Sequence, residues 1–238
     1  MKKQLVIIPG WGGTKESWQK FSDMAEADFE VHCLELPCFG ENPYPKEVWG
    51  VDEYADYVAK EIEELDKPII LGHSFGGQVA VNLVARKKDV CSQLILSGAA
   101  VLRPEKKTKK ACFRFLAKIG KSFFSLPGIN KAEKLAKKVL YKIADSPDYN
   151  KTDGIKREIF QKITRQSQKE KLQDIMVQTL VVWGENDSYV PLEEGKLFTS
   201  IIKNSKLEIV KNGRHGLHIN NTEELLKIIK DFTGSNVI

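Results

Sequence analysis

Residues 69–77 read Ile-Ile-Leu-Gly-His-Ser-Phe-Gly-Gly, and the chain continues to residue 85 as Gln-Val-Ala-Val-Asn-Leu-Val-Ala. The apolar beginning predicts a buried parallel strand and the continuation predicts a helix, so Ser74 lies where strand turns to helix. Gly72 and Gly76 lack a Cβ atom, which allows a sharp turn that strains Ser74 and lifts its hydroxyl out of the sheet. A nucleophile elbow needs this context. By itself, Gly-X-Ser-X-Gly favours an ordinary tight turn, so the rest of the chain has to decide between the two.

Strands and helices alternate on both sides of this stretch. Short apolar runs that predict strands occupy residues 5–8, 29–36, 69–71, 91–97, 179–183 and 206–210. Apolar stripes at helical spacing lie between these runs, for example from Val51 to Leu65. The alternation predicts an α/β fold with a mostly parallel sheet and helices on both of its faces.

One long segment interrupts the alternation. From residue 98 to about residue 175 no strand is evident, and apolar stripes between residues 112 and 163 have the spacing of amphipathic helices. We therefore expect a helical cap at 98–175, inserted into one core made of residues 1–97 and 176–238. A chain of 238 residues is long enough for one such core and short for two ordinary domains.

The residues that could activate Ser74 follow later strands. A serine hydroxyl is a poor nucleophile at neutral pH, so it needs a base within hydrogen-bond reach and an acid that orients the base. Asp187 follows one predicted strand, and His215 and His218 follow the next. Because open α/β sheets bind ligands at the carboxyl ends of their strands, we expect these side chains near Ser74. His73 should point to the side of the sheet opposite Ser74 and be buried. Position alone does not decide whether His215 or His218 is the base.

Four stretches of the sequence resemble the α/β-hydrolase family. Residues 183–191, Trp-Gly-Glu-Asn-Asp-Ser-Tyr-Val-Pro, are similar to its acid loop, and residues 213–218, Gly-Arg-His-Gly-Leu-His, to its histidine loop. Residues 9–13, Pro-Gly-Trp-Gly-Gly, resemble its oxyanion loop, although proline stands where the family commonly has histidine. Residues 37–40, Pro-Cys-Phe-Gly, match its Pro-Gly-X-Gly turn in part, with cysteine in place of the first glycine. The likeness covers the whole chain except the cap.

The resemblance implies a role for each matching residue. Ser74 would attack the substrate carbonyl, His215, the first of the two histidines, would act as the base, and Asp187 would hold its imidazole. The backbone N–H groups of Trp11 and Phe75 would form the oxyanion hole. Trp11 and Phe75, together with Phe39, would also wall an apolar substrate pocket beside the nucleophile.

These roles predict a cofactor-free serine carboxylesterase that acts on a small-molecule ester of a small or medium acyl chain. A serine at position 74 excludes haloalkane dehalogenases and epoxide hydrolases, which use an aspartate there. Thioesterase, lactonase, amidase and carbon–carbon hydrolase activities remain open with the same triad. A non-catalytic ligand receptor on the same fold is a rival from a different class of protein. Retention of Ser74, Asp187 and His215 argues against the receptor.

The predicted cap is strongly basic. Residues 103–142 hold thirteen Lys or Arg against two Glu, in a chain whose net charge is +5. A solvated polar face explains this charge, and so does contact with an anionic partner such as an acyl carrier protein or a membrane surface. The overall organisation of the chain, with Gly-Trp-Gly in the oxyanion loop, resembles that of the esterases that demethylate pimeloyl-carrier esters, which use a basic cap. The apolar residues of the basic run fit a helical stripe, so it lacks interleaved exposed aromatic residues. It also matches no recognisable nucleic-acid-reading motif, and we expect no nucleic-acid partner.

Composition and cysteine content indicate the class of protein, the state of its thiols and its cellular location. The charged and hydrophobic fractions, 29% and 42%, are those of a soluble globular protein. Cys33, Cys38, Cys91 and Cys112 include no Cys-X-X-Cys pair and no histidines at zinc spacing, so they predict free thiols and no metal site. The apolar run near the N-terminus is too short for a signal peptide, which predicts a cytoplasmic location.

Overall fold

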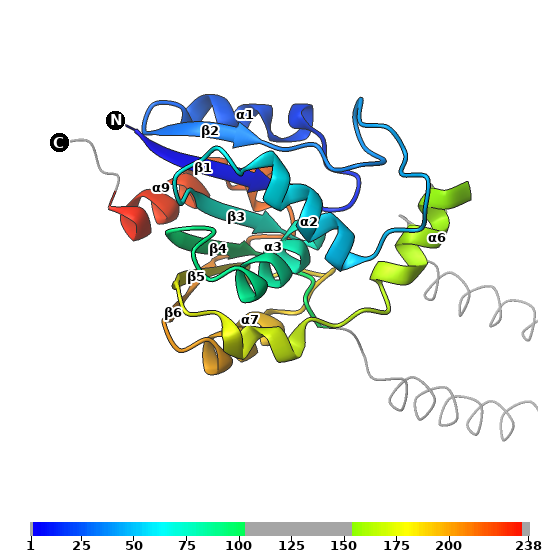
Figure 1. Cartoon of the computed structure of the whole chain (residues 1–238). Coiled ribbons are helices and arrows are strands. Elements are labelled where there is room, and N and C mark those ends of the chain that lie inside the picture. Colours follow the sequence, from blue (N-terminus) through cyan, green and yellow to red (C-terminus); the bar gives the residue numbers. More distant parts are fainter. Residues whose placement is uncertain (1, 103–153, 235–238) are drawn as a thin grey trace, which may run out of the picture.

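The computed structural model of the chain describes residues 2–102 and 154–234. These residues form a six-stranded sheet in the order β2-β1-β3-β4-β5-β6 (Figure 1). Its strands are β1 (Lys3–Ile8), β2 (Phe29–Cys33), β3 (Ile69–His73), β4 (Gln93–Ser97), β5 (Gln178–Gly184) and β6 (Ser205–Val210). All neighbouring strands in this sheet are parallel, which confirms the prediction made from the alternating pattern.

Helices cover both faces of the sheet. One face carries α2 (Val51–Glu61), α3 (Phe75–Arg86) and α7 (Leu192–Ile201), and the other carries α1 (Lys15–Ala25), α8 (Leu217–Asn220) and α9 (Thr222–Thr233). Successive side chains of a strand point to opposite faces, so Val6 and Ile8 pack into the first layer and Leu5 and Ile7 into the second. No helix in the described parts of the chain is long and apolar enough to cross a membrane.

The strand order reverses between β1 and β3. From β1 the chain moves outward to β2, returns past β1 to β3, and then continues through β4, β5 and β6. Open α/β sheets bind ligands at the carboxyl ends of the strands beside such a reversal. The loop at 9–13 leaves β1 and Ser74 follows β3, so the topology places both at this point.

Several predicted boundaries differ from those of the structure. The second strand ends at Cys33 instead of residue 36. The chain leaves the sheet near Glu35, whose carboxylate accepts hydrogen bonds from the backbone N–H groups of Lys15 (3.2 Å) and Glu41 (3.4 Å). The stretch that resembles the histidine loop runs into one helical turn, α8 (Leu217–Asn220). Burial of Leu217 between the sheet and α9 stabilises that turn.

The described parts of the predicted cap are residues 98–102 and 154–175. Helix α6 (Gly154–Ile163) buries Ile159 and Ile163, at the helical spacing predicted for the cap, and a 3-10 helix, η1 (Lys169–Asp174), follows it. Figure 1 shows α6 beyond the carboxyl ends of the strands. The basic run at 103–142 lies outside the described residues, so the limits of the cap and its anionic partner remain predictions.

The described ends of the inserted segment lie side by side. The backbone N–H of Gln168 donates a hydrogen bond to the carbonyl of Val101 (3.1 Å). Two buried side-chain amides of α3 form hydrogen bonds to the chain where it returns to the sheet after α6. Asn82 donates to the side chain of Gln168 (2.9 Å), and Gln78 donates to the carbonyl of Gln166. The chain therefore leaves the sheet after β4 and returns towards β5 at one place, as the predicted insertion requires.

Candidate active site

Ser74 occupies a strained turn between β3 and α3. Its backbone angles, φ 52° and ψ −116°, lie where residues other than glycine are rarely found. The turn is fixed to the next strand, because Ser74 N–H donates to the carbonyl of Ser97 (3.1 Å). A Cβ atom on Gly76 would lie 2.0 Å from the carbonyl oxygen of Ile8, so only glycine fits there. The sharp turn predicted from the glycines is thus present.

The start of α3 and the loop from β1 both lie beside Ser74. Helix α3 begins at Phe75, and the first N–H groups of a helix lack acceptors within the helix and favour negative charge. The loop from β1 packs against Ser74: a Cβ atom on Gly10 would lie 3.1 Å from the Cβ atom of Ser74. Trp11, the next residue, contacts the ring of Phe75 with ring centroids 5.7 Å apart. The two residues proposed as oxyanion donors are therefore neighbours.

Asp187 and His215 form a buried hydrogen bond. His215 Nδ1 and Asp187 Oδ2 are 2.7 Å apart, and the Asp187 side chain is fully buried. The other carboxylate oxygen, Oδ1, accepts hydrogen bonds from the backbone N–H groups of Tyr189 (2.8 Å) and Val190 (2.9 Å). A carboxylate accepts hydrogen bonds and a neutral imidazole has one N–H, so Nδ1 carries the proton and Nε2 of His215 is the nitrogen that can accept one.

Gly98 allows Asp187 and His215 to meet beside Ser74. Gly98 follows β4 with a φ of +50°, and a Cβ atom on it would lie 3.1 Å from Asp187 Oδ2 and 3.2 Å from His215 Nδ1. Ser97, its neighbour, accepts the hydrogen bond from Ser74 N–H. Within the described residues the Ser74 hydroxyl makes no hydrogen bond to His215. Such bonds often tighten only when substrate is bound.

Tyr189 covers one side of the His215 ring and was not predicted. The two rings stack with centroids 5.1 Å apart and an angle of 26° between their planes. Tyr189 is nevertheless 62% exposed, so it lies at the rim of the site. It belongs to the acid-loop stretch, but the sequence could not show that its ring turns back onto the histidine.

His218 lies behind the site. Its ring stacks on Trp18 of α1 with centroids 3.9 Å apart and planes 6° from parallel, and it is buried. The ring of His73 contacts both His218 and His215, in each case with centroids 4.8 Å apart. Of the two histidines that position left open, His215 is the one bonded to Asp187. His73 is buried, as predicted.

The burial of His218 should make the protein sensitive to acid. Burial first, and His215 second, lowers the pKa of His218 from 6.5 to about 4. The folded state therefore binds this proton less tightly than the unfolded chain. The contribution of His218 to the free energy of unfolding is therefore at its maximum above pH 6.5. It falls by about 3 kcal/mol as the pH is lowered from 6.5 to 4.

Urea unfolding at pH 7.5 and pH 4.5 tests this. The wild type should lose about 2 to 3 kcal/mol more unfolding free energy between the two pH values than His218→Leu does. Equal losses in the two proteins would refute the prediction.

Predicted wall residues meet around Trp11. Its ring contacts Phe39 (centroids 4.8 Å apart) and Phe75, and also Phe160 of α6 (5.1 Å). Lys156, also on α6, places its ammonium 4.4 Å from the centre of the Phe39 ring. Sequence reasoning missed Phe160, because nothing in a helical stripe identifies which apolar residue reaches the core loops. Phe160 lies next to the predicted stripe of Ile155, Ile159 and Ile163 and does not belong to it.

The described cysteines are poor nucleophiles. Burial raises the pKa of Cys33 and Cys91 to about 12 and also raises that of Cys38, so all three are thiols at neutral pH. Cys112 lies outside the described residues. Among residues 2–102 and 154–234, no three His, Cys, Asp or Glu side chains are grouped to bind a metal ion.

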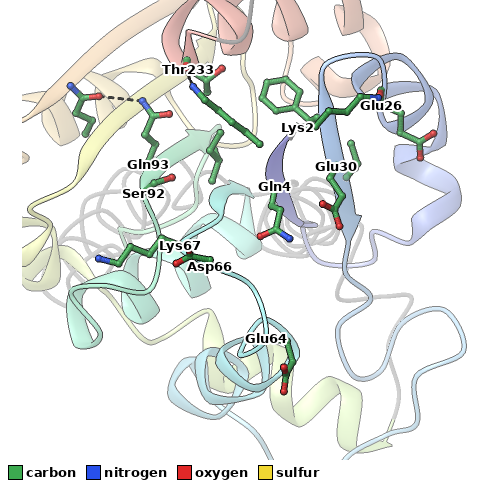
Figure 2. Close-up of a pocket in the computed structure, with 15 residues that line it drawn as sticks. Lys2, Gln4, Glu26, Glu30, Glu64, Asp66, Lys67, Ser92, Gln93 and Thr233 are labelled. Carbon is green, nitrogen blue, oxygen red and sulfur yellow. Dashed lines mark hydrogen bonds between the residues drawn. The ribbon is translucent and has the colours of Figure 1, made fainter.

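A groove of about 1160 Å³ lies at the opposite edge of the sheet. Figure 2 shows its polar rim, with Gln4 and Gln93 near the starts of their strands and the charged Glu30 and Lys67 beside them. Ser74 follows a strand end, so this groove is remote from the candidate active site. We assign no function to it.

Comparison with known proteins agrees with this architecture. The sequence profile of a family described as alpha/beta hydrolase fold matches residues 3–222. The chain is 26% identical to a pimeloyl-[acyl-carrier protein] methyl ester esterase of Neisseria meningitidis, over 97% of this chain and 93% of the relative.

Among solved structures, the chain resembles an esterase from Exiguobacterium antarcticum with a TM-score of 0.73 and 19% identity, covering 98% of this chain and 92% of the esterase. A bromoperoxidase from Bacillus anthracis gives a TM-score of 0.71 and 22% identity, with the same coverage of both chains. These two likenesses support the fold and leave the reaction to be argued from the site.

Proposed function

Because the chain belongs to the alpha/beta hydrolase fold family, we propose that it is a serine hydrolase whose substrates are carboxylic esters with small or medium acyl chains. Ser74 is the nucleophile, His215 the base and Asp187 the residue that orients the base. The observation that carries this proposal is the 2.7 Å hydrogen bond between His215 and the buried Asp187, beside a serine held in a strained turn. The esterase among the full-length relatives supports the same class of substrate.

Acylation is the first half of the proposed reaction. Ser74 Oγ forms a bond to the ester carbonyl carbon while its proton passes to Nε2 of His215. The carbonyl oxygen becomes an oxyanion, which the backbone N–H groups of Trp11 and Phe75 stabilise. The bond to the leaving alcohol then breaks, and His215 gives its proton to that alcohol.

Deacylation repeats these steps with water. His215 takes a proton from a water molecule as the water oxygen bonds to the acyl carbon, and the bond to Ser74 Oγ breaks. His215 returns the proton to Ser74, so the acid is released and the enzyme is regenerated. Asp187 stabilises the imidazolium in both halves through the hydrogen bond to Nδ1.

Two measurements test the proposal. A fluorophosphonate probe should label the wild type, and peptide mass spectrometry should place the label on Ser74. A series of p-nitrophenyl esters from acetate to laurate should be hydrolysed with a chain-length optimum that reports the size of the pocket. Absence of both labelling and turnover would favour a ligand receptor, whereas labelling without ester turnover would point to a thioester, lactone or carbon–carbon bond as the substrate.

A further inference from the structure

His73 has a specific contact that burial alone does not explain. It ends β3 on the face of the sheet opposite the α3 layer and is 7% exposed. Around its ring lie Trp18 of α1, His218 of α8 and His215. Its Nε2 atom is 3.1 Å from the backbone carbonyl oxygen of His215.

The chemistry of this contact determines which nitrogen of the His73 imidazole carries the proton. A carbonyl oxygen only accepts hydrogen bonds, so Nε2 of His73 carries the proton and donates it. Burial, followed by the neighbouring His218 and His215, holds the pKa of His73 well below its usual range. These two histidines are the titratable groups that face it, and α1 contributes the uncharged Trp18. His73 therefore stays neutral, with Nδ1 unprotonated.

The other side of the ring faces the loop from β1. A Cβ atom on Gly10 would lie 3.0 Å from His73 Nδ1 and 3.1 Å from the Cβ atom of Ser74. The His73 ring thus lies between the loop that carries Trp11 and the loop that carries His215. Through the main chain it is also joined directly to Ser74, which is the next residue.

We propose that His73 is a positioning residue for the hydrolytic reaction, which donates a hydrogen bond from Nε2 to the carbonyl of His215 and thereby sets the place of that base relative to Ser74. The inference rests on the proposed function of Ser74 and His215. The bond joins the loop of the base to the residue before the nucleophile, so a change in its length changes the separation of the two reacting groups. A displacement of about 1 Å in such a pair lowers rates by about 100-fold.

A role limited to packing predicts a different pattern. The carbonyl of His215 also accepts a hydrogen bond from Leu217 N–H (3.2 Å), so loss of the His73 donor leaves this acceptor satisfied. His218 is buried in the same cluster and stacks closely on Trp18, but among residues 2–102 and 154–234 its side chain makes no hydrogen bond to the main chain of His215. Substitution of His218 is therefore the matched control for general disturbance of the cluster.

The decisive comparison is between His73→Gln and His73→Met. The two side chains are similar in length, but only glutamine has an N–H donor that can reach the position of Nε2. We expect kcat for p-nitrophenyl acetate to fall 10- to 100-fold in His73→Met with KM within about twofold, and to be largely restored in His73→Gln. The control, His218→Met, should keep kcat within about threefold.

Equal kcat values in the glutamine and methionine variants, or an equal loss in His218→Met, would overturn the proposal. A measurement on the wild type applies even where a variant does not fold. Nitrogen-15 NMR of the histidine side chains should find His73 as the neutral tautomer with the proton on Nε2, and the opposite tautomer would refute the hydrogen bond. Failure of the proposed function is recognised separately, because the wild type would then show neither labelling nor turnover while the tautomer remained measurable.

Discussion

Replacing Ser74 by alanine should lower kcat for p-nitrophenyl esters by about 10⁶-fold, the scale seen when a serine hydrolase loses its nucleophile. The substitution removes only the hydroxyl, so the turn, the N–H groups of Trp11 and Phe75 and the hydrogen bond between Asp187 and His215 should persist. Residual rate enhancement from these groups should remain measurable above the uncatalysed reaction. Labelling by the fluorophosphonate should be lost completely.

Ser97→Ala is the matched control for this experiment. Ser97 ends the neighbouring strand, is buried, and its hydroxyl has no hydrogen-bond partner among the described residues. Its contact with Ser74 is made through the main-chain carbonyl, which alanine retains. Activity of Ser97→Ala should stay within a few-fold of the wild type. Comparable losses in both variants would mean that Ser74 is not the nucleophile.

Removal of the base should have an effect of similar size. His215→Ala should lower kcat by about 10⁶-fold, because it removes the imidazole proposed to take the proton from Ser74 and return it to the leaving alcohol. His218→Ala should cost less than about tenfold, since His218 stacks on Trp18 and the hydrogen bond to Asp187 belongs to His215.

Kinetics of the two variants side by side, with circular dichroism to confirm that each is folded, provide the measurement. A large loss in His218→Ala with activity retained in His215→Ala would reverse the assignment. A large loss in both would show that His218 supports the site in a way that its contacts do not indicate.

The sequence was sufficient for the fold because its strong signals are local. The apolar run before Gly72 and the helix after Gly76 specify a strand, a turn and a helix without reference to the rest of the chain. Alternation of such units leads to a parallel sheet, and parallel strands bring their carboxyl ends to one edge. This reasoning also placed Asp187 and His215 near each other, which their hydrogen bond now demonstrates.

Contacts between particular side chains could not be predicted. The stacking of Tyr189 on His215 and the hydrogen bond from His73 to a carbonyl 142 positions away require the packed structure. The early end of β2 has the same origin, because it depends on backbone donors of Lys15 and Glu41 that meet one carboxylate. Periodicity reports which face of an element is apolar, but it does not report which partner each side chain meets.

The hydrogen bond between Gln168 and Val101 has an evolutionary consequence. Because the chain departs from the sheet and rejoins it at one point, insertions and deletions in the intervening segment need not alter the register of β4 against β5. The proposed catalytic residues all follow strands outside that segment. Descendants of this fold could therefore exchange the whole intervening segment by recombination while inheriting Ser74, Asp187 and His215 unchanged.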